Sequence, residues 1–374
     1  MKSKVYSLLL FLSCLLWLGG APAGASDTPF PLKTYWVYVL SESADEISLV
    51  RLDREGARVE RRFKTGNMPS DLSGPHGIVV SPDKRYYYVS LGHGRPYGTA
   101  LKYSSENDRI LGQTTLGLFP ATASLTPNGE LLFVVNFNLH GDMVPSSVSV
   151  VATEDMLEIA RIPTCVMPHG SRVNPQGTFH YSACMMDDLL VELDTRALKV
   201  SRHFLLTKGL EKGMAGSPSG ENPMVHGAAA CSPTWAQPSV DGTSIFVACN
   251  RSSEIVEIDA NTWTLKRRIP ARPGVYNLSV TNKGRMVATN KRDQSISIYD
   301  LTTGKELSRI PTSKKIVHGV TVSPDDLYAF VSVEGIGSES GLVEVVDLTR
   351  LEIIAEVSVG PQAAGIDFMK MTPP

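Results

Sequence analysis

The chain has 374 residues, with 36 basic and 38 acidic side chains and a formal net charge of −2 at pH 7. This balance argues against a general nucleic-acid-binding surface, which would need a basic face. Hydrophobic residues make up 42% of the chain, so a large core can form. The length exceeds that of most single domains, unless the chain closes a ring of repeats.

The first 25 residues have the pattern of a secretory signal peptide. Lys2 and Lys4 give a positive start, an apolar run continues to about Leu18, and small residues lead to Ala25, the expected cleavage site. A membrane anchor needs about 20 apolar residues, and neither this run nor any later one is long enough. We therefore expect residues 26–374 to be periplasmic or secreted, without a membrane span.

A hairpin motif recurs along the rest of the chain. An alternating apolar run is followed by a turn rich in Pro, Asp, Asn or Gly and by a second β-rich run, which is typical of two antiparallel strands. Examples are PHGIVVSPDKRYYYVS from residue 75, PHGSRVNPQGTFHYSAC from 168 and VHGVTVSPDDLYAFVS from 317. We also assign VHGAAACSP from residue 225 to this motif, followed after an insertion by SIFVACN.

A strand–turn–strand motif such as SISIYDLTTGKELSRIP occurs seven times, beginning near residues 46, 99, 147, 189, 254, 295 and 342. This spacing is typical of propeller blades. YWVYVL near the N-terminus and PQAAGIDFMKM near the C-terminus are left over, and pairing them would remove the open sheet edge. The sequence therefore predicts an all-β fold: residues 26–374 form one seven-bladed β-propeller, and its last blade is closed by the N- and C-terminal strands.

Several segments resemble the YVTN repeat of YncE-like propellers. They include HGVTVSPDDLYAFVSVE, SISIYDLTTGKEL and LVEVVDL, and the resemblance covers essentially the whole chain after the signal peptide. It implies the propeller fold. Such propellers serve as lactonases, ligand binders, cofactor holders and surface scaffolds, so the resemblance implies no single function.

The start of the innermost strand of each blade places one residue at the top mouth of the central channel. Aligning the repeats gives the seven residues His76, Ala121, His169, His226, Tyr276, His318 and Gln362. Four of them are histidines, although the chain has only eight. Neutral imidazole suits copper, zinc and iron. We therefore predict that a metal ion, copper or zinc, or another cofactor is held by His76, His169, His226 and His318, with His93 from a neighbouring loop.

The alternative is that the His–Gly pair is part of the repeat itself. The imidazole would then bond a neighbouring blade, and the glycine would allow close packing at the crowded channel. The ring also resembles the propeller of nitrous oxide reductase, whose channel histidines hold a copper cluster. Because Ala121, Tyr276 and Gln362 interrupt the ring, the resemblance implies at most a mononuclear site.

The sulfur-containing residues admit two interpretations. Cys165 and Cys184 flank one predicted strand at the same end, so they could form a disulfide. As free ligands, these thiols and the thioether of Met167 would favour copper. We assign Cys231 to a turn at the bottom face, and leave it, His180 and His203 out of the site.

Basic residues after the second strands predict an anion-binding rim. The predicted ligand-binding residues are Arg95, Arg251, Arg292 and Tyr276, because fork-shaped guanidinium groups suit carboxylates and phosphates. The alternative is a solvated rim, paired with acids such as Asp293 and Glu334. The Gly- and Pro-rich insertion 205–224 is either a lid over the channel mouth or irregular decoration.

The sequence contains neither a G-x-S-x-G elbow nor a CxxCH haem-attachment motif, and a non-covalent haem stays open. We expect an exported binding protein that holds a metal ion, cofactor or small anionic ligand at the top of its channel. One alternative is a metal-assisted oxidoreductase or lactonase-type hydrolase that uses the same pocket. The other is an interaction scaffold with a protein partner on that face.

Overall fold

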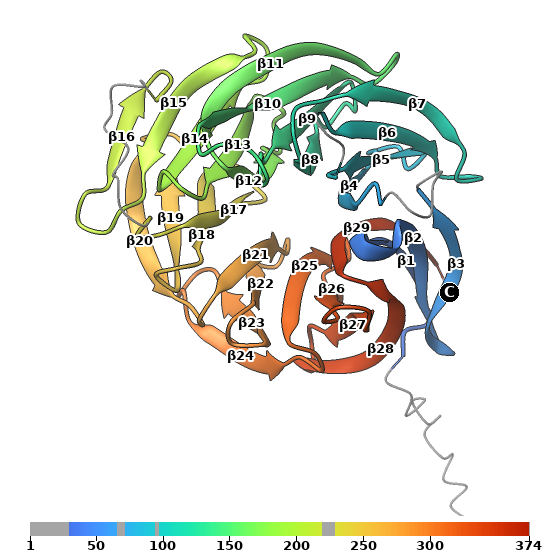
Figure 1. The fold of residues 1–374 in the computed structure, drawn as a ribbon. Coiled ribbons are helices and arrows are strands. Elements are labelled where there is room, and N and C mark those ends of the chain that lie inside the picture. Colours follow the sequence, from blue (N-terminus) through green and yellow to red (C-terminus); the bar gives the residue numbers. More distant parts are fainter. Residues whose placement is uncertain (1–29, 66–71, 94–96, 219–228, 374) are drawn as a thin grey trace, which may run out of the picture.

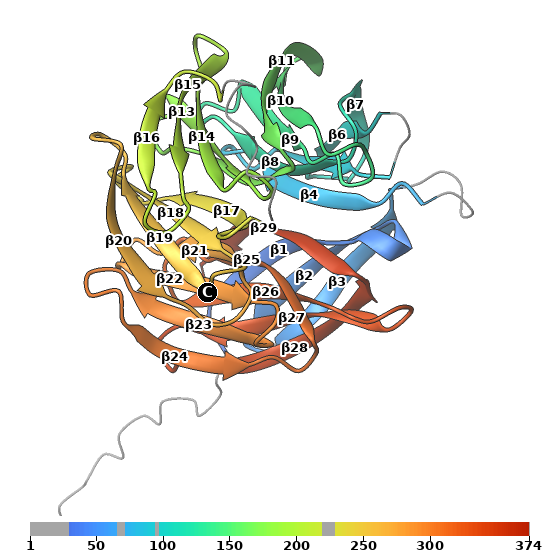
Figure 2. The ribbon, with the colours of Figure 1, turned by 60° about the vertical axis from the view of Figure 1, so that its left-hand side comes forward.

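Alternating apolar residues and tight turns give each blade four antiparallel strands, which follow one another from the channel outward, and one blade has a fifth. The computed structural model describes residues 30–65, 72–93, 97–218 and 229–373. In this part of the chain seven sheets surround a central channel (Figures 1 and 2), as the sequence predicts.

The strands, grouped by blade, have the following bounds: β29 (Ala363–Thr372), β1 (Thr34–Ser41), β2 (Glu46–Asp53) and β3 (Gly56–Lys64); β4 (Pro75–Val80), β5 (Tyr86–Leu91), β6 (Thr99–Ser104) and β7 (Ile110–Thr115); β8 (Pro120–Leu125), β9 (Leu131–Asn136), β10 (Pro145–Ala152) and β11 (Leu157–Val166); β12 (Pro168–Val173), β13 (Phe179–Cys184), β14 (Leu189–Asp194), β15 (Lys199–Leu205) and β16 (Lys212–Ala215); β17 (Pro233–Pro238), β18 (Ser244–Cys249), β19 (Glu254–Asp259) and β20 (Thr264–Pro270); β21 (Val275–Val280), β22 (Arg285–Asn290), β23 (Ser295–Asp300) and β24 (Glu306–Pro311); β25 (Ile316–Val322), β26 (Tyr328–Glu334), β27 (Ser340–Asp347) and β28 (Glu352–Pro361). A single 3₁₀ turn, η1 (Glu42–Ala44), follows β1 in the described residues.

The predicted ring closure is confirmed. β29 is the innermost strand of the blade that contains β1, β2 and β3. It pairs with β1 in antiparallel register, with Val37 opposite Phe368 and Tyr38 opposite Asp367. The two ends of the described chain thus complete one sheet, and that blade has no exposed inner edge.

One predicted strand is wrong. The innermost strand that pairs with SIFVACN is β17, not VHGAAACSP, since Trp235 lies opposite Ala248 and Ala236 opposite Val247. The physical signal is Pro233, which begins β17 as Pro75 and Pro168 begin β4 and β12. Residues 219–228, which include the first four residues of the misassigned segment, lie outside the described residues.

The insertion at 205–224 does not lie wholly over the channel. Its residues 212–215 form β16, a fifth strand that pairs with β15 at the outer edge of its blade (Figure 1). The lid interpretation is therefore wrong for this part of the insertion. No helix among the described residues has the length and apolar character needed to cross a bilayer.

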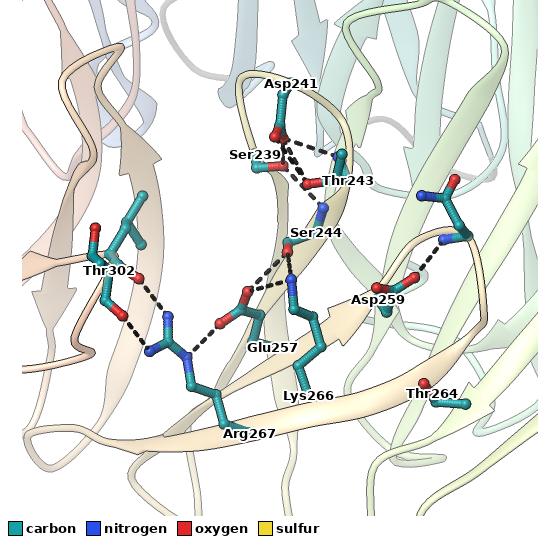
Figure 3. A network of polar contacts seen from close by, with 12 residues as sticks. Ser239, Asp241, Thr243, Ser244, Glu257, Asp259, Thr264, Lys266, Arg267 and Thr302 are labelled. Atoms are coloured by element: carbon teal, nitrogen blue, oxygen red, sulfur yellow. Dashed lines mark hydrogen bonds and ion pairs between the residues drawn. The ribbon is translucent and has the colours of Figure 1, made fainter.

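Neighbouring blades are tied at their outer strands by a repeated arginine bridge. Arg267 on β20 donates from Nε to Glu257 Oε2 at 2.5 Å, and its Nη1 donates to the carbonyl of Thr302 in the next blade at 3.1 Å (Figure 3). Arg202 on β15 does the same one blade earlier, since it contacts Glu192 and donates to the carbonyl of Ala260 at 2.6 Å. These half-buried pairs hold adjacent blades in register.

The four cysteines of the described residues form two disulfides, Cys165–Cys184 and Cys231–Cys249. The assignment of Cys231 to the bottom face is wrong, because it precedes β17 and meets the last residue of β18. In each bridge the first cysteine comes shortly before an innermost strand, β12 or β17. The second cysteine is the last residue of the strand that follows it, β13 or β18. The two bridges thus occupy equivalent places in adjacent blades. Cys165 and Cys184 therefore act as a loop clamp, and the bridged sulfurs supply no thiolate ligand.

We expect each disulfide to contribute about 3 kcal/mol to the free energy of unfolding, by closing loops of 19 and 18 residues in the unfolded chain. Cys165→Ala/Cys184→Ala and Cys231→Ala/Cys249→Ala should each lower it by this amount in urea titrations. Equal midpoints for wild type with and without reductant would contradict the prediction.

The His–Gly pairs pack the innermost strands together. A Cβ on Gly77 would lie 1.9 Å from the carbonyl oxygen of Ala121, and one on Gly170 would lie 2.3 Å from that of Thr234. The Oγ of Ser90 accepts from the N–H of Gly77 at 2.9 Å and donates to the same Ala121 oxygen at 2.6 Å. The glycines therefore let the next blade approach, which sets the residues before them at the channel mouth.

The same contacts correct the predicted ring. Ser332 Oγ donates to the carbonyl of Ala364 at 2.6 Å, as Ser90 does to Ala121, so Ala364 and not Gln362 occupies the seventh position. Gln362 precedes β29 with a left-handed φ of 54°. In the blade of β17 the equivalent residue is Thr234, whose Oγ1 donates to the carbonyl of Tyr276 at 2.8 Å. His226 lies outside the described residues.

Candidate functional site

Four side chains from four different blades meet at the channel mouth. Ring centroids are 6.1 Å apart for His76 and His169, 5.4 Å for His169 and Tyr276, 5.0 Å for Tyr276 and His318, and 5.7 Å for His318 and His76. These contacts form a closed cycle, which we call the channel-mouth ring. Three of the predicted metal-site histidines and the predicted ligand-binding Tyr276 are therefore brought together.

His169 is held by hydrogen bonds on both ring nitrogens. Nδ1 lies 3.0 Å from the carbonyl of Thr234, so it donates, and Nε2 lies 3.0 Å from the hydroxyl of Tyr276 and accepts. The side chain is 2% exposed. Burial, together with the charge of His76, lowers the pKa of His169 to about 3. It is therefore a neutral imidazole that positions Tyr276, and it has no free lone pair for a metal.

His76 is oriented by a buried carboxylate. Glu42, in η1, lies with Oε2 2.8 Å from His76 Nδ1 and with Oε1 2.8 Å from His93 Nε2. Burial alone would raise the pKa of Glu42, but His76 and His93 outweigh it and hold it at about 2. The hydrogen bond to Glu42 raises the pKa of His93. Nε2 of His76 has no hydrogen-bond partner among the described residues, so it is the ring nitrogen open to a ligand.

His318 is the second imidazole with an unused nitrogen. Its Nδ1 is buried without a partner in the described part of the chain, and Nε2 lies 3.9 Å from Glu334 Oε1. Burial, followed by the charge of Lys291, lowers the pKa of His318 well below 6.5. Both His318 and His169 are thus uncharged at neutral pH.

Lys291 and Glu334 add a charge pair beside the ring. Lys291 Nζ lies 3.2 Å from Glu334 Oε1 and 3.9 Å from the centroid of Tyr276. Burial lowers the pKa of Lys291, and Glu334 opposes that shift. At this part of the rim, Lys291 is thus paired with an acid, Glu334, and lies half-buried against the face of Tyr276.

Two phenylalanines that the sequence did not single out form the wall. The ring of Phe119 lies 5.4 Å from His76 and 5.9 Å from His93, and Phe137 lies 4.8 Å from His169. Both phenylalanines are almost fully buried, with 2% and 6% of their surface exposed, so they form an apolar layer behind these imidazoles.

The predicted arginine rim is only partly described. Arg292 donates from Nη2 to the backbone carbonyl of Asn250 at 2.6 Å, so it ties two loops together. Arg251 is exposed, and Arg95 lies outside the described residues. Lys291, rather than Arg292, is the cation that reaches the ring.

The described residues contain no group of three or more His, Cys, Asp or Glu side chains placed to hold a metal ion. His169 is fully hydrogen-bonded, and all cysteines in this part of the chain are bridged. The available donors are His76 Nε2 and His318. Two imidazoles are too few to coordinate a bare ion by themselves. They fit better a metal that already has other ligands.

Glu42 is the main residue that the sequence analysis missed. It follows the second strand of its blade, β1, as His93 follows β5. This place after the second strand of a blade is the sequence signal that Glu42 shares with His93.

No protein-family model matches the chain, and no curated protein matches it in sequence. Solved structures do match in fold. A hydrazine synthase chain of Kuenenia stuttgartiensis is 17% identical, with 83% of this chain and 97% of that chain covered and a TM-score of 0.63. The dihydro-heme d1 dehydrogenase NirN in complex with DHE is 15% identical, with coverages of 94% and 78% and a TM-score of 0.56. At these identities the likeness shows the fold alone: the chain is a seven-bladed β-propeller, and the YVTN resemblance stays a prediction.

Proposed function

We propose that this protein is an exported binding protein whose channel mouth holds a small metal-bearing ligand, with His76 Nε2 facing the metal. The carrying observation is the pair of 2.8 Å contacts from Glu42 to His76 and His93. A carboxylate that binds one ring nitrogen of a histidine fixes its orientation and makes the other nitrogen a better metal ligand. Neutral His318, the neighbour of His76 in the ring, is the second candidate contact.

The surroundings favour a ligand that is larger than an ion. Phe119 and Phe137 form an apolar layer behind the histidines, and the cation Lys291 suits an anionic group at the ligand's edge. A tetrapyrrole has this combination and supplies four of its metal's ligands itself. The structural neighbour NirN is a dihydro-heme d1 dehydrogenase in complex with DHE, which accords with this class. A bare copper or zinc ion would need a third protein ligand, such as His226.

Export is supported by the two disulfides, because such bridges form and persist in oxidising compartments. The predicted signal peptide, residues 1–25, lies outside the described residues, and periplasmic or secreted localisation is part of the proposal.

Three probes test the site: ferric haem by absorption titration, and Cu²⁺ and Zn²⁺ by calorimetry. We expect ferric haem to bind the wild type with a Soret shift, and His76→Ala to weaken it at least tenfold. Lys305→Ala changes an exposed side chain in the turn between β23 and β24, outside the channel-mouth ring, and should bind as the wild type does. Equal haem affinity in both variants would contradict the proposal.

The same preparations separate the remaining alternatives. Stoichiometric Cu²⁺ or Zn²⁺ that is lost in His76→Ala/His318→Ala would assign the ring to a bare ion. Turnover of a lactone or of a redox substrate would assign it to an enzyme. If replacement of His76, His169 and His318 left the binding of every probe and of any protein partner unchanged, only the interaction-scaffold alternative would remain.

A further inference from the structure

A second polar region lies inside the channel, away from the mouth. Arg172 follows His169 by three residues on β12, and Asp367 lies on β29. Both are half-buried residues of innermost strands. The ring order β29, β4, β8, β12 separates these strands by two blades. Innermost strands border the channel (Figure 1), and both side chains keep part of their surface exposed there.

Arg172 has no carboxylate partner. Its guanidinium carbon lies 4.4 Å from the ring centroid of Trp235 on the neighbouring β17, and Nη1 donates to the carbonyl of Ser171 at 2.9 Å. Among the described residues it forms no ion pair within 4.0 Å. Asp367 is engaged elsewhere, since its carboxylate accepts from the N–H groups of Val80 at 2.8 Å and of Phe368 at 2.9 Å. Burial lowers the pKa of Arg172 to about 10, so it stays charged at neutral pH.

The groups beside Arg172 also have unused polar atoms. Trp235 is 6% exposed, and its indole N–H has no partner in the described residues. His180, opposite Val173 on the adjoining strand, is 0% exposed, and both of its ring nitrogens are without partners there. Buried donors without acceptors are rare, because each costs about 1–3 kcal/mol. Apart from the bond from Nη1 to Ser171, the N–H groups of the Arg172 guanidinium have no acceptor among the described residues.

We propose that Arg172 and Trp235 form a second binding site, inside the channel, for a small monovalent oxyanion of the carboxylate or nitrate type. The guanidinium fork matches two oxygens of a planar anion, and the indole of Trp235 is the platform on which the guanidinium lies. Asp367 on the opposite wall disfavours anions of higher charge. This site is distinct from the channel-mouth ring and does not depend on the ligand proposed there.

Calorimetric titration with acetate, nitrate and sulfate at constant ionic strength tests the site. We expect saturable binding of acetate or nitrate to the wild type, weaker binding of sulfate, and a loss of at least tenfold in Arg172→Met. Arg309→Met removes a surface arginine that pairs with Asp293 at 2.6 Å, and it should bind as the wild type does. His76→Ala should leave anion binding unchanged.

The stability of the variants separates an anion site from a structural clamp. Arg172→Met keeps an apolar chain on Trp235 and removes an unpaired charge, so without anion it should melt at or above the wild-type temperature. Arg172→Lys keeps the charge without the fork and should bind several-fold more weakly. The absence of saturable binding to the wild type would overturn the proposal. The proposal would also be overturned if Arg172→Lys bound the anion as well as the wild type does and Arg172→Met melted at a much lower temperature.

Discussion

Acidification below pH 6.5 is expected to destabilise this protein steeply, because three buried histidines resist protonation in the folded state. Burial lowers the pKa of His169 and of His180 to about 3, and that of His318 well below 6.5. The unfolded chain therefore binds more protons between pH 6.5 and about 3. The free energy of unfolding should fall through this window by up to about 1.4 kcal/mol per pH unit for each histidine.

His180 isolates one of these contributions. Its ring stacks on Phe133 at 5.0 Å, with 18° between the planes, and both nitrogens are without hydrogen-bond partners in the described residues. The charge of Arg172 also opposes its protonation. Phenylalanine fits this place without a titrating group. His180→Phe should match or exceed wild-type stability at pH 7 and reduce the pH slope by up to about 1.4 kcal/mol per pH unit.

Urea unfolding at pH 7, 6, 5 and 4 measures these slopes. His140→Gln, on the exposed surface, is the matched control and should follow the wild-type curve. Parallel curves for wild type and His180→Phe would show that the protonation of His180 does not limit acid stability.

The fold was predictable because two periodic signals agree along the chain. Alternating apolar residues mark each strand, and Pro, Asn, Asp and Gly mark each turn, so the seven copies of the strand–turn–strand motif set the number of blades. The error at residue 225 came from treating His–Gly as the mark of an innermost strand. Pro233 begins the strand in that blade, and Thr234 stands where a histidine was expected. Strand pairing, which decides this, is a long-range property that a local motif does not contain.

The channel-mouth ring was predictable in part, for the same reason. His76, His169 and His318 follow from the repeat register, since strand alternation fixes the direction of each side chain. Glu42 and Phe119 lie in loops, and loop conformation depends on contacts with other blades. Phe119 has a left-handed φ of 50°, a conformation for which its sequence gives no signal.

The two interpretations of the His–Gly pair apply to different histidines. His169 bonds a neighbouring blade through the carbonyl of Thr234 and orders Tyr276, as a structural repeat element would. His76 occupies the equivalent position, but it turns one nitrogen to Glu42 and leaves the other open. The same repeat position thus has a packing role in one blade and leaves a ring nitrogen open in another.

The glycine of the pair should be the least replaceable residue of the repeat. A Cβ at Gly77 would meet the backbone oxygen of Ala121 at 1.9 Å, and one at Gly170 would meet that of Thr234 at 2.3 Å. A backbone carbonyl cannot rotate away as a side chain can, so the adjacent blade must shift. We expect Gly77→Ala and Gly170→Ala each to lower the free energy of unfolding by at least about 3 kcal/mol, at the upper end of overpacking effects.

Gly112 on the outer strand β7 provides the matched control for this prediction. A Cβ there would lie 2.9 Å from Cγ of Met156, a side chain with three rotatable bonds that can move aside. Gly112→Ala should therefore change the free energy of unfolding by less than about 1 kcal/mol. Urea unfolding of the three variants decides the matter, and equal losses would mean that the channel strands can separate. Because His76 precedes Gly77 directly, Gly77→Ala should also weaken ferric haem binding. Gly170→Ala should instead first disturb His169 and its hydrogen bond with the hydroxyl of Tyr276.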